Sequence, residues 1–160
     1  VNTTSPAPSD GDVLTYKSGS GQWEAAAPQG GGGGAGLTSR TTSAAVASNI
    51  ANGGSQNITI TAAKTYALLK IQTSHAAWVT LYSDTTSRSA DASRSEFTDP
   101  TPGSGVLAEV ITGGSATQLI TPATVCFNSS GSNTTYAKIV NKSGSTVNLT
   151  VTLTLVGLEV

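Results

Sequence analysis

The chain has little of several components on which common functions depend. Its 160 residues include a single cysteine, Cys126, which excludes a disulfide within the chain and a zinc site built from cysteines. Charged residues make up 11% of the sequence, its formal net charge is −1, and its basic residues form no stripe, so we expect no nucleic-acid partner. No apolar run approaches the length of a transmembrane helix, so we expect no membrane insertion. Methionine is absent and the first residue is Val1, so we expect this chain to be part of a longer protein.

The sequence is instead rich in Thr, Ser, Gly and Ala, with Val, Ile and Leu gathered in short runs, mostly after Ile58. Such runs between Gly, Asn and Ser turns predict strands, and no helical periodicity lasts beyond a turn or two. We therefore expect an all-β domain, either an antiparallel β-sandwich or a jelly-roll-like barrel. Its predicted strands cover residues 56–61, 65–72, 77–83, 105–112, 118–128, 135–141 and 146–158.

Three connecting segments carry further expectations. The Ser-Gly-Ser sequence at residues 143–145 predicts a tight hairpin between the last two strands. Residues 84–104 form a long polar excursion, which we expect to cross one end of the sandwich. Residues 38–48 fit either an extended edge or a brief helical turn, and their pattern does not decide between the two.

The N-terminal segment has the pattern of one small β-hairpin. Val13, Leu14 and Tyr16 begin a strand, a Ser-Gly-Ser-Gly turn reverses it, and Trp23 begins the return. A lone two-stranded hairpin is marginal in water, and five glycines follow it at residues 30–34. We therefore expect these four apolar residues to contact other copies of the chain. The predicted parts are an N-terminal hairpin attachment segment, a Gly-rich linker and a β-sandwich domain, at residues 1–28, 29–37 and 38–160.

Residues 10–28, with the sequence DGDVLTYKSGSGQWEAAAP, resemble a short element that recurs in structural proteins of tailed bacteriophages. It is most similar to the element found in fibre-like proteins of phages of cyanobacteria, ahead of a Gly-rich stretch. The part from Tyr66 onward is only loosely similar to the terminal β-domains of those proteins. The resemblance implies a virion fibre or appendage, and it implies that the hairpin segment serves in trimerisation. The matching residues are Gly11, Asp12, Val13, Leu14, Tyr16, Gly21 and Trp23.

No pattern in the sequence is typical of a catalytic, cofactor or metal site. The one histidine, His75, lies at a predicted turn, and no serine has the surroundings of a nucleophile elbow. The acids of residues 84–104 are interspersed with arginines, which is typical of salt bridges that order a loop. Trp78 and Tyr82 lie four residues apart on one predicted strand and so face the same side. We interpret both as core or interface residues, and glycan contact is the alternative. The possible ligand-contact residues are Trp78, Tyr82, Arg88, Asp91 and Arg94.

These observations together predict a non-enzymatic structural protein of a virion. We expect the C-terminal part of a homotrimeric phage tail fibre or appendage, which has no cofactor and contacts the host surface. The expected partners are other copies of the chain, other virion proteins, and a glycan or receptor of the host cell. One alternative is a capsid decoration or head-fibre protein, and another is a glycan- or receptor-binding module.

Overall fold

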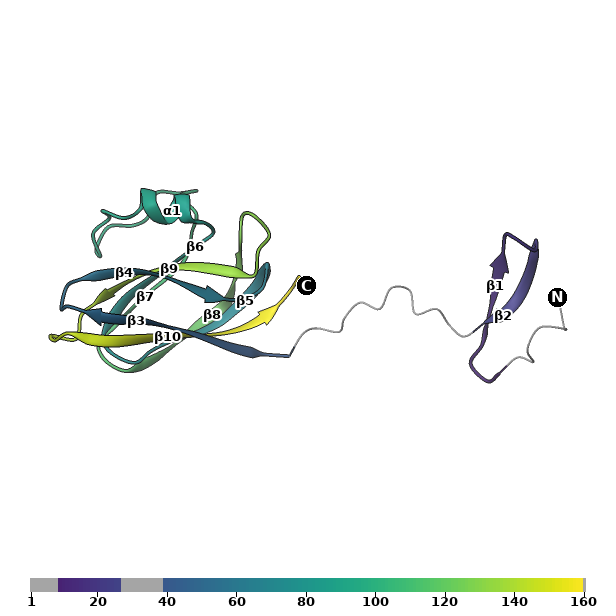
Figure 1. The fold of residues 1–160 in the computed structure, drawn as a ribbon, viewed down its shortest axis with the longest axis horizontal. Coiled ribbons are helices and arrows are strands. Elements are labelled where there is room, and N and C mark those ends of the chain that lie inside the picture. The colour runs from purple at the N-terminus through teal and green to yellow at the C-terminus, as the bar shows by residue number, and fades with distance from the viewer. Residues whose placement is uncertain (1–8, 27–38, 160) are drawn as a thin grey trace. The chain divides into compact units, whose positions relative to one another are not determined.

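The computed structural model describes residues 9–26 and 39–159 and divides the chain into two compact units, Val1–Gly36 and Leu37–Val160 (Figure 1). The predicted glycine-rich linker, residues 29–37, lies outside the described residues. In the described ranges the first unit contains one hairpin, and the second contains two sheets and one short helix.

The hairpin forms as the sequence predicts. Strand β1 (Val13–Lys17) pairs antiparallel with β2 (Gln22–Ala26), and Tyr16 lies directly opposite Trp23. The turn closes where the backbone N–H of Gly21 donates to the carbonyl of Lys17 at 2.8 Å. Gly21 has a φ of 64°, in the left-handed region that glycine adopts at low cost, and this explains why the chain reverses here.

The second unit is a sandwich of two antiparallel sheets, which confirms the predicted all-β architecture. The first sheet, called the β10 sheet, has the order β3 (Thr41–Ile50), β10 (Val147–Gly157), β5 (Thr65–Thr73) and β8 (Ala116–Phe127). The second, called the β6 sheet, has the order β4 (Ser55–Thr61), β9 (Thr134–Asn141), β6 (Ala77–Tyr82) and β7 (Val106–Thr112). Every predicted strand is present within one or two residues, and the undecided segment 38–48 contributes to strand β3.

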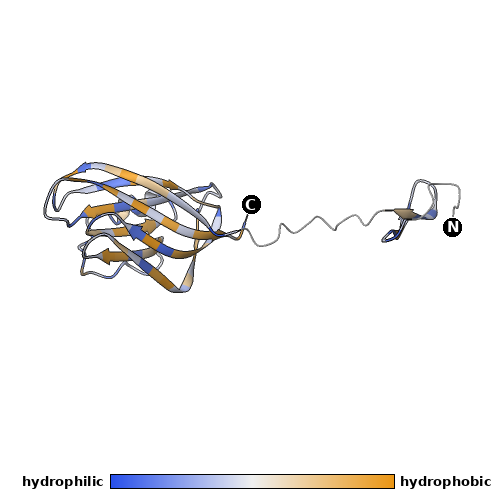
Figure 2. Ribbon diagram, turned by 90° about the horizontal axis from the view of Figure 1, so that it is seen from below, coloured by the Kyte–Doolittle hydropathy of each residue, from blue (hydrophilic) through white to orange (hydrophobic). Residues whose placement is uncertain are grey.

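The core lies between the sheets because side chains alternate along each strand. Leu149, Val151 and Leu153 of β10 are fully buried, whereas the threonines between them are partly exposed. These leucines and valine belong to one apolar cluster with Leu81 and Ile139 of the β6 sheet. Figure 2 shows the resulting alternation of apolar and polar residues along the strands. Each buried side chain of this kind contributes about 1.5–3 kcal/mol, so this layer provides the main driving force for folding.

The prediction of a hairpin around residues 143–145 is wrong. The two strands that this turn joins, β9 and β10, belong to different sheets and do not pair with each other. The chain crosses from one sheet to the other at this turn, and the buried side chain of Asn141 holds the crossing. Its Nδ2 donates to the carbonyls of Ile50 and Ser145, both at 2.7 Å. The Gly and Ser residues of a turn indicate that the chain reverses, but they do not indicate which sheet the next strand joins.

Residues 84–104, called the strap, do not cross an end of the sandwich as expected. They begin with the short helix α1 (Thr85–Ala90) and lie over the outer face of the β6 sheet (Figure 1). Arg88 Nη1 donates to the carbonyl of Ile58 in β4 at 2.9 Å, and Lys138 of β9 donates to strap carbonyls. The two strands that the strap joins, β6 and β7, are neighbours in one sheet, so its ends meet at the same end of that sheet.

Candidate functional site

The hairpin has one apolar face. The pairing register places Leu14, Tyr16, Trp23 and Ala25 on the same side, and Val13 on the opposite side. The Tyr16 and Trp23 rings lie 5.4 Å apart between centroids at an angle of 57°, a favourable tilted contact. Leu14, Tyr16 and Trp23 are nevertheless 60%, 52% and 53% exposed. Three of the four predicted interface residues therefore form one solvent-exposed apolar surface.

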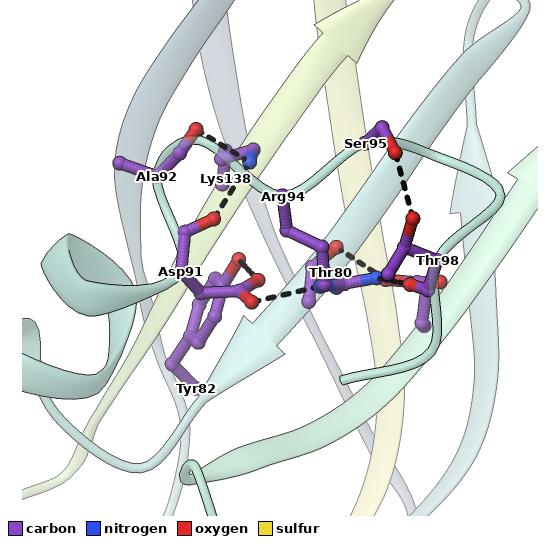
Figure 3. Close-up of polar contacts among 9 residues, drawn as sticks. Thr80, Tyr82, Asp91, Ala92, Arg94, Ser95, Thr98 and Lys138 are labelled. Atoms are coloured by element: carbon purple, nitrogen blue, oxygen red, sulfur yellow. Dashed lines mark hydrogen bonds and ion pairs between the residues drawn. The ribbon is translucent and has the colours of Figure 1, made fainter. Parts of the chain in front are cut away.

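The residues predicted as possible ligand contacts gather at the strap. Trp78 and Tyr82 share the outer face of β6, as predicted, but the strap covers them, and they are 4% and 0% exposed. The Tyr82 hydroxyl donates to Asp91 Oδ2 of the strap at 2.7 Å (Figure 3). Both faces of β6 are therefore buried, one by the core and the other by the strap.

Arg94 is the centre of these contacts. Its Nε donates to Asp91 Oδ1 at 2.7 Å, its Nη2 donates to the Glu109 carboxylate, and its Nη1 donates to the carbonyl of Thr98 at 2.8 Å. Its guanidinium carbon lies 5.2 Å from the centre of the Trp78 ring, within cation–π range. One strap side chain thus binds its own loop, strand β7 and strand β6.

Lys138 attaches the strap to the third strand of the sheet. Its Nζ donates to the carbonyls of Asp91 and Ala92, each at 3.1 Å, and lies 4.8 Å from the centre of the Trp78 ring. The two cations, Arg94 and Lys138, are balanced in formal charge by two carboxylates. We call this set the charge cluster, and its members are Trp78, Tyr82, Asp91, Arg94, Glu109 and Lys138.

The contacts of the charge cluster determine how its groups ionise. Burial opposes ionisation of Asp91 and Glu109, but hydrogen bonds outweigh burial and lower both carboxyl pKa values. Arg94 donates to both carboxylates, Tyr82 donates to Asp91, and Thr80 donates to Glu109. Burial raises the pKa of Tyr82, and the bond to Asp91 raises it further. Burial lowers the pKa of Lys138. At neutral pH both carboxyls are therefore ionised acceptors, and Tyr82 is a neutral donor.

The five predicted ligand-contact residues are thus occupied by contacts within the chain. Trp78, Tyr82, Asp91 and Arg94 belong to the charge cluster, and Arg88 bonds the carbonyl of Ile58 beside it. Arg88 also lies 5.4 Å from the centre of the Tyr136 ring. A ligand would have to displace the strap to reach these groups. The arrangement therefore acts as a structural clasp, by which we mean a set of contacts that holds the strap on the β6 sheet.

Sequence reasoning missed Phe97, which is 91% exposed in the strap. A turn holds it in place, because the Thr98 N–H donates to the Ser95 carbonyl at 3.1 Å and the two hydroxyls bond at 2.8 Å. Glu96 pairs with Lys142 of the sandwich beside the same turn. The signal was available in the sequence: Phe97 is the one aromatic residue in an otherwise polar segment.

The residues with side chains suited to catalysis or metal binding, His75 and Cys126, lie in contacts within the chain or in its core. His75 Nδ1 bonds Ser74 Oγ at 2.9 Å, and that oxygen also accepts the backbone N–H of Thr150 at 2.9 Å. Cys126 is buried, and burial raises its thiol pKa to about 11. Within residues 9–26 and 39–159, no group of three or more His, Cys, Asp and Glu residues could hold a metal ion. A pocket of about 380 Å³ lies between the paired ends of β3 and β10 on one side and residues 61–63 and Asn133 on the other, and Glu159 is its ionisable lining residue.

No protein-family model matches the chain, and no curated protein matches it with significant similarity. The fold and the sites therefore define its class by themselves: an all-β sandwich whose chain also carries a hairpin with an exposed apolar face. Of the described part of the chain, no helix is long and apolar enough to cross a membrane.

Proposed function

We propose that this chain is a non-enzymatic structural protein of a virion, the C-terminal part of a homotrimeric phage fibre or appendage. The observation that carries the proposal is the exposed apolar face of the hairpin, Leu14, Tyr16 and Trp23. The resemblance of residues 10–28 to the phage element supplies the virion location and the trimer. In this proposal, other copies of the chain and other virion proteins are its partners.

The physical argument is that the hairpin is incomplete alone. Two strands without a covering layer are marginally stable in water, and three large apolar side chains lie on one side of this pair. Each of them contributes about 1.5–3 kcal/mol when it is fully buried. The same face on sister copies, arranged around a common axis, covers these side chains with identical chemistry.

Trp23→Ala tests this contact. Light scattering of the full chain at micromolar concentration should give a trimer, and Trp23→Ala should dissociate it while the thermal melting of the sandwich stays unchanged. Phe97→Ala is the matched control, since it removes an exposed aromatic outside the hairpin. A monomeric wild-type chain, or a Trp23→Ala variant with unaltered mass, would contradict the proposal. Imaging of virions with the chain labelled separates a fibre from a capsid decoration protein.

A role in contacting the host surface is the second candidate, and Phe97 favours it. The side chain projects from a hydrogen-bonded turn and is almost fully exposed, so it is accessible to a partner. The full chain should then bind glycans on an array or a purified host receptor, and Phe97→Ala should remove that binding. Binding that survives the substitution would exclude Phe97 as the contact.

A further inference from the structure

The outer face of the β10 sheet contains large apolar side chains that the described residues of the sandwich unit leave exposed. Leu119, Val125 and Phe127 of edge strand β8 are 67%, 58% and 47% exposed, and Val46 of edge strand β3 is 55% exposed. The register places Val125, Phe127 and Val46 on the outer side, because their neighbours Cys126 and Ala47 point into the core. Leu119 lies on the same side because it pairs with the exposed Lys70. Apolar residues therefore lie at both edges of this face.

The two outer faces of the sandwich differ in how they are covered. The strap lies over the β6 sheet and buries Trp78 and Tyr82 there. Figure 1 places helix α1 beside β4 and β9, on the side of the molecule away from β3 and β10. The outer face of the β10 sheet, in the described chain, keeps Leu119 and Val125 more than half exposed. Within the described part of the sandwich unit, the chain's own loop covers one face, and the other face has no such cover.

The open face is nearly free of charge. The four strands of the β10 sheet contain one charged residue, Lys70, and the two edge strands contain none. Monomeric proteins usually protect sheet edges with charged side chains, above all lysine. Interface cores, in contrast, are depleted in charge. The face therefore combines exposed apolar side chains on its edge strands with mainly uncharged polar side chains on its central strands, and it lacks the charges that usually protect an exposed sheet edge.

We propose that the outer face of the β10 sheet packs against a second copy of this chain. Strands lie about 4.8 Å apart and rise about 3.3 Å per residue, so four strands of this length cover roughly 600 Å² in projection. Side chains standing above the sheet enlarge that area, and a stable interface needs about 800 Å² per partner. The face is therefore the right size for one contact between sandwiches.

This proposal rests on the proposed function in one respect. Assembly through the hairpins holds the copies close together and raises their effective concentration.

The chemistry of the face favours a copy of itself over other occupants. A nucleic acid or an acidic protein would require a cluster of cations, and the strands of this face offer only Lys70. A small molecule would require a concave site, whereas this surface is a four-stranded sheet. Outer faces of neighbouring copies can meet around the common axis of the proposed trimer without placing clustered like charges against each other.

Photo-cross-linking of the full chain tests the contact directly. Gln72 is an exposed residue of central strand β5, paired with Thr152 and Thr117 on this face. A benzophenone maleimide attached to Gln72→Cys should cross-link to a second copy, and mass spectrometry should map the product to a sandwich domain. The same label on Ile111→Cys is the control, since Ile111 is 43% exposed on the other sheet. Native Cys126 is buried and leaves no background labelling.

Leu119→Glu gives an independent measurement by sedimentation velocity. In a Trp23→Ala background, which is dissociated at micromolar concentration, it should weaken the self-association that remains at higher protein concentration roughly tenfold, whereas Ile111→Glu should not. Cross-links from Gln72→Cys confined to its own copy, with equal association of the two Glu variants, would overturn the face contact. A mass unchanged by Trp23→Ala but reduced by Leu119→Glu would overturn the hairpin contact alone, so the two proposals fail separately.

Discussion

Replacing Arg94 with methionine tests whether the charge cluster holds the strap to the sandwich. The substitution keeps an unbranched side chain over Trp78 but removes the cation from between Asp91 and Glu109. The side chains of Arg94 and Asp91 are each 7% exposed, and that of Glu109 is 24% exposed. Removing one partner of a buried ion pair costs about 3–5 kcal/mol. Because water screens Glu109 in part, we expect a loss of about 3 kcal/mol in the free energy of unfolding.

Urea unfolding in a Trp23→Phe background measures this loss, because Trp78 is then the only tryptophan and reports on the sandwich. With a urea dependence of about 1–3 kcal/mol per molar, the midpoint should fall by roughly 1–3 M. Arg40→Met is the matched control, since Arg40 is exposed and its loss should change stability by less than about 0.5 kcal/mol. A loss below about 1 kcal/mol for Arg94→Met would refute the reasoning that this cluster is a structural clasp.

Two further predictions concern the strap. The lowered carboxyl pKa values of Asp91 and Glu109 mean that the unfolded chain binds more protons in acid, so their contribution to stability is complete above their unfolded pKa of about 4 and is lost as pH falls through the lowered values. Urea midpoints between pH 7 and pH 2 should show this loss, and Arg94→Met should flatten it. Gly105→Ala should lower the free energy of unfolding by about 1–3 kcal/mol more than Gly131→Ala does, and its melting temperature should fall further. Both glycines have positive φ, but only at Gly105 would a Cβ meet backbone-anchored atoms, 2.7 Å from Ser87 Cβ. Equal melting temperatures for the two variants would exclude that close approach.

Local patterns in the sequence predicted most of the elements. Apolar and polar residues alternate along residues 146–158, and this predicts the inward leucines and valine of β10. Successive side chains of a strand point to opposite faces, so the strand's own sequence shows which face is apolar. The N-terminal hairpin could be predicted from a Gly-containing turn between Tyr16 and Trp23 for the same reason. The candidate interface on this hairpin follows directly, since a two-stranded unit has no second layer to cover its apolar side chains.

The sequence could not predict which strands become neighbours or what covers a sheet from outside. Asn141 bonds Ile50, which lies far away along the chain, and only folding brings that carbonyl within reach. The possible ligand-contact residues illustrate the same limit: periodicity placed Trp78 and Tyr82 on one face of β6 but contained nothing about the strap above them.

Thus the sequence by itself determined the strands, the two faces of each strand and the exposed aromatic pair of the hairpin, because those depend on residues that are close along the chain. Only the tertiary structure decided that one outer face of the sandwich is closed by a clasp of buried charges and that the other is open. Those two outcomes depend on contacts between distant segments, such as Arg94 with Glu109 and Lys138 with Asp91.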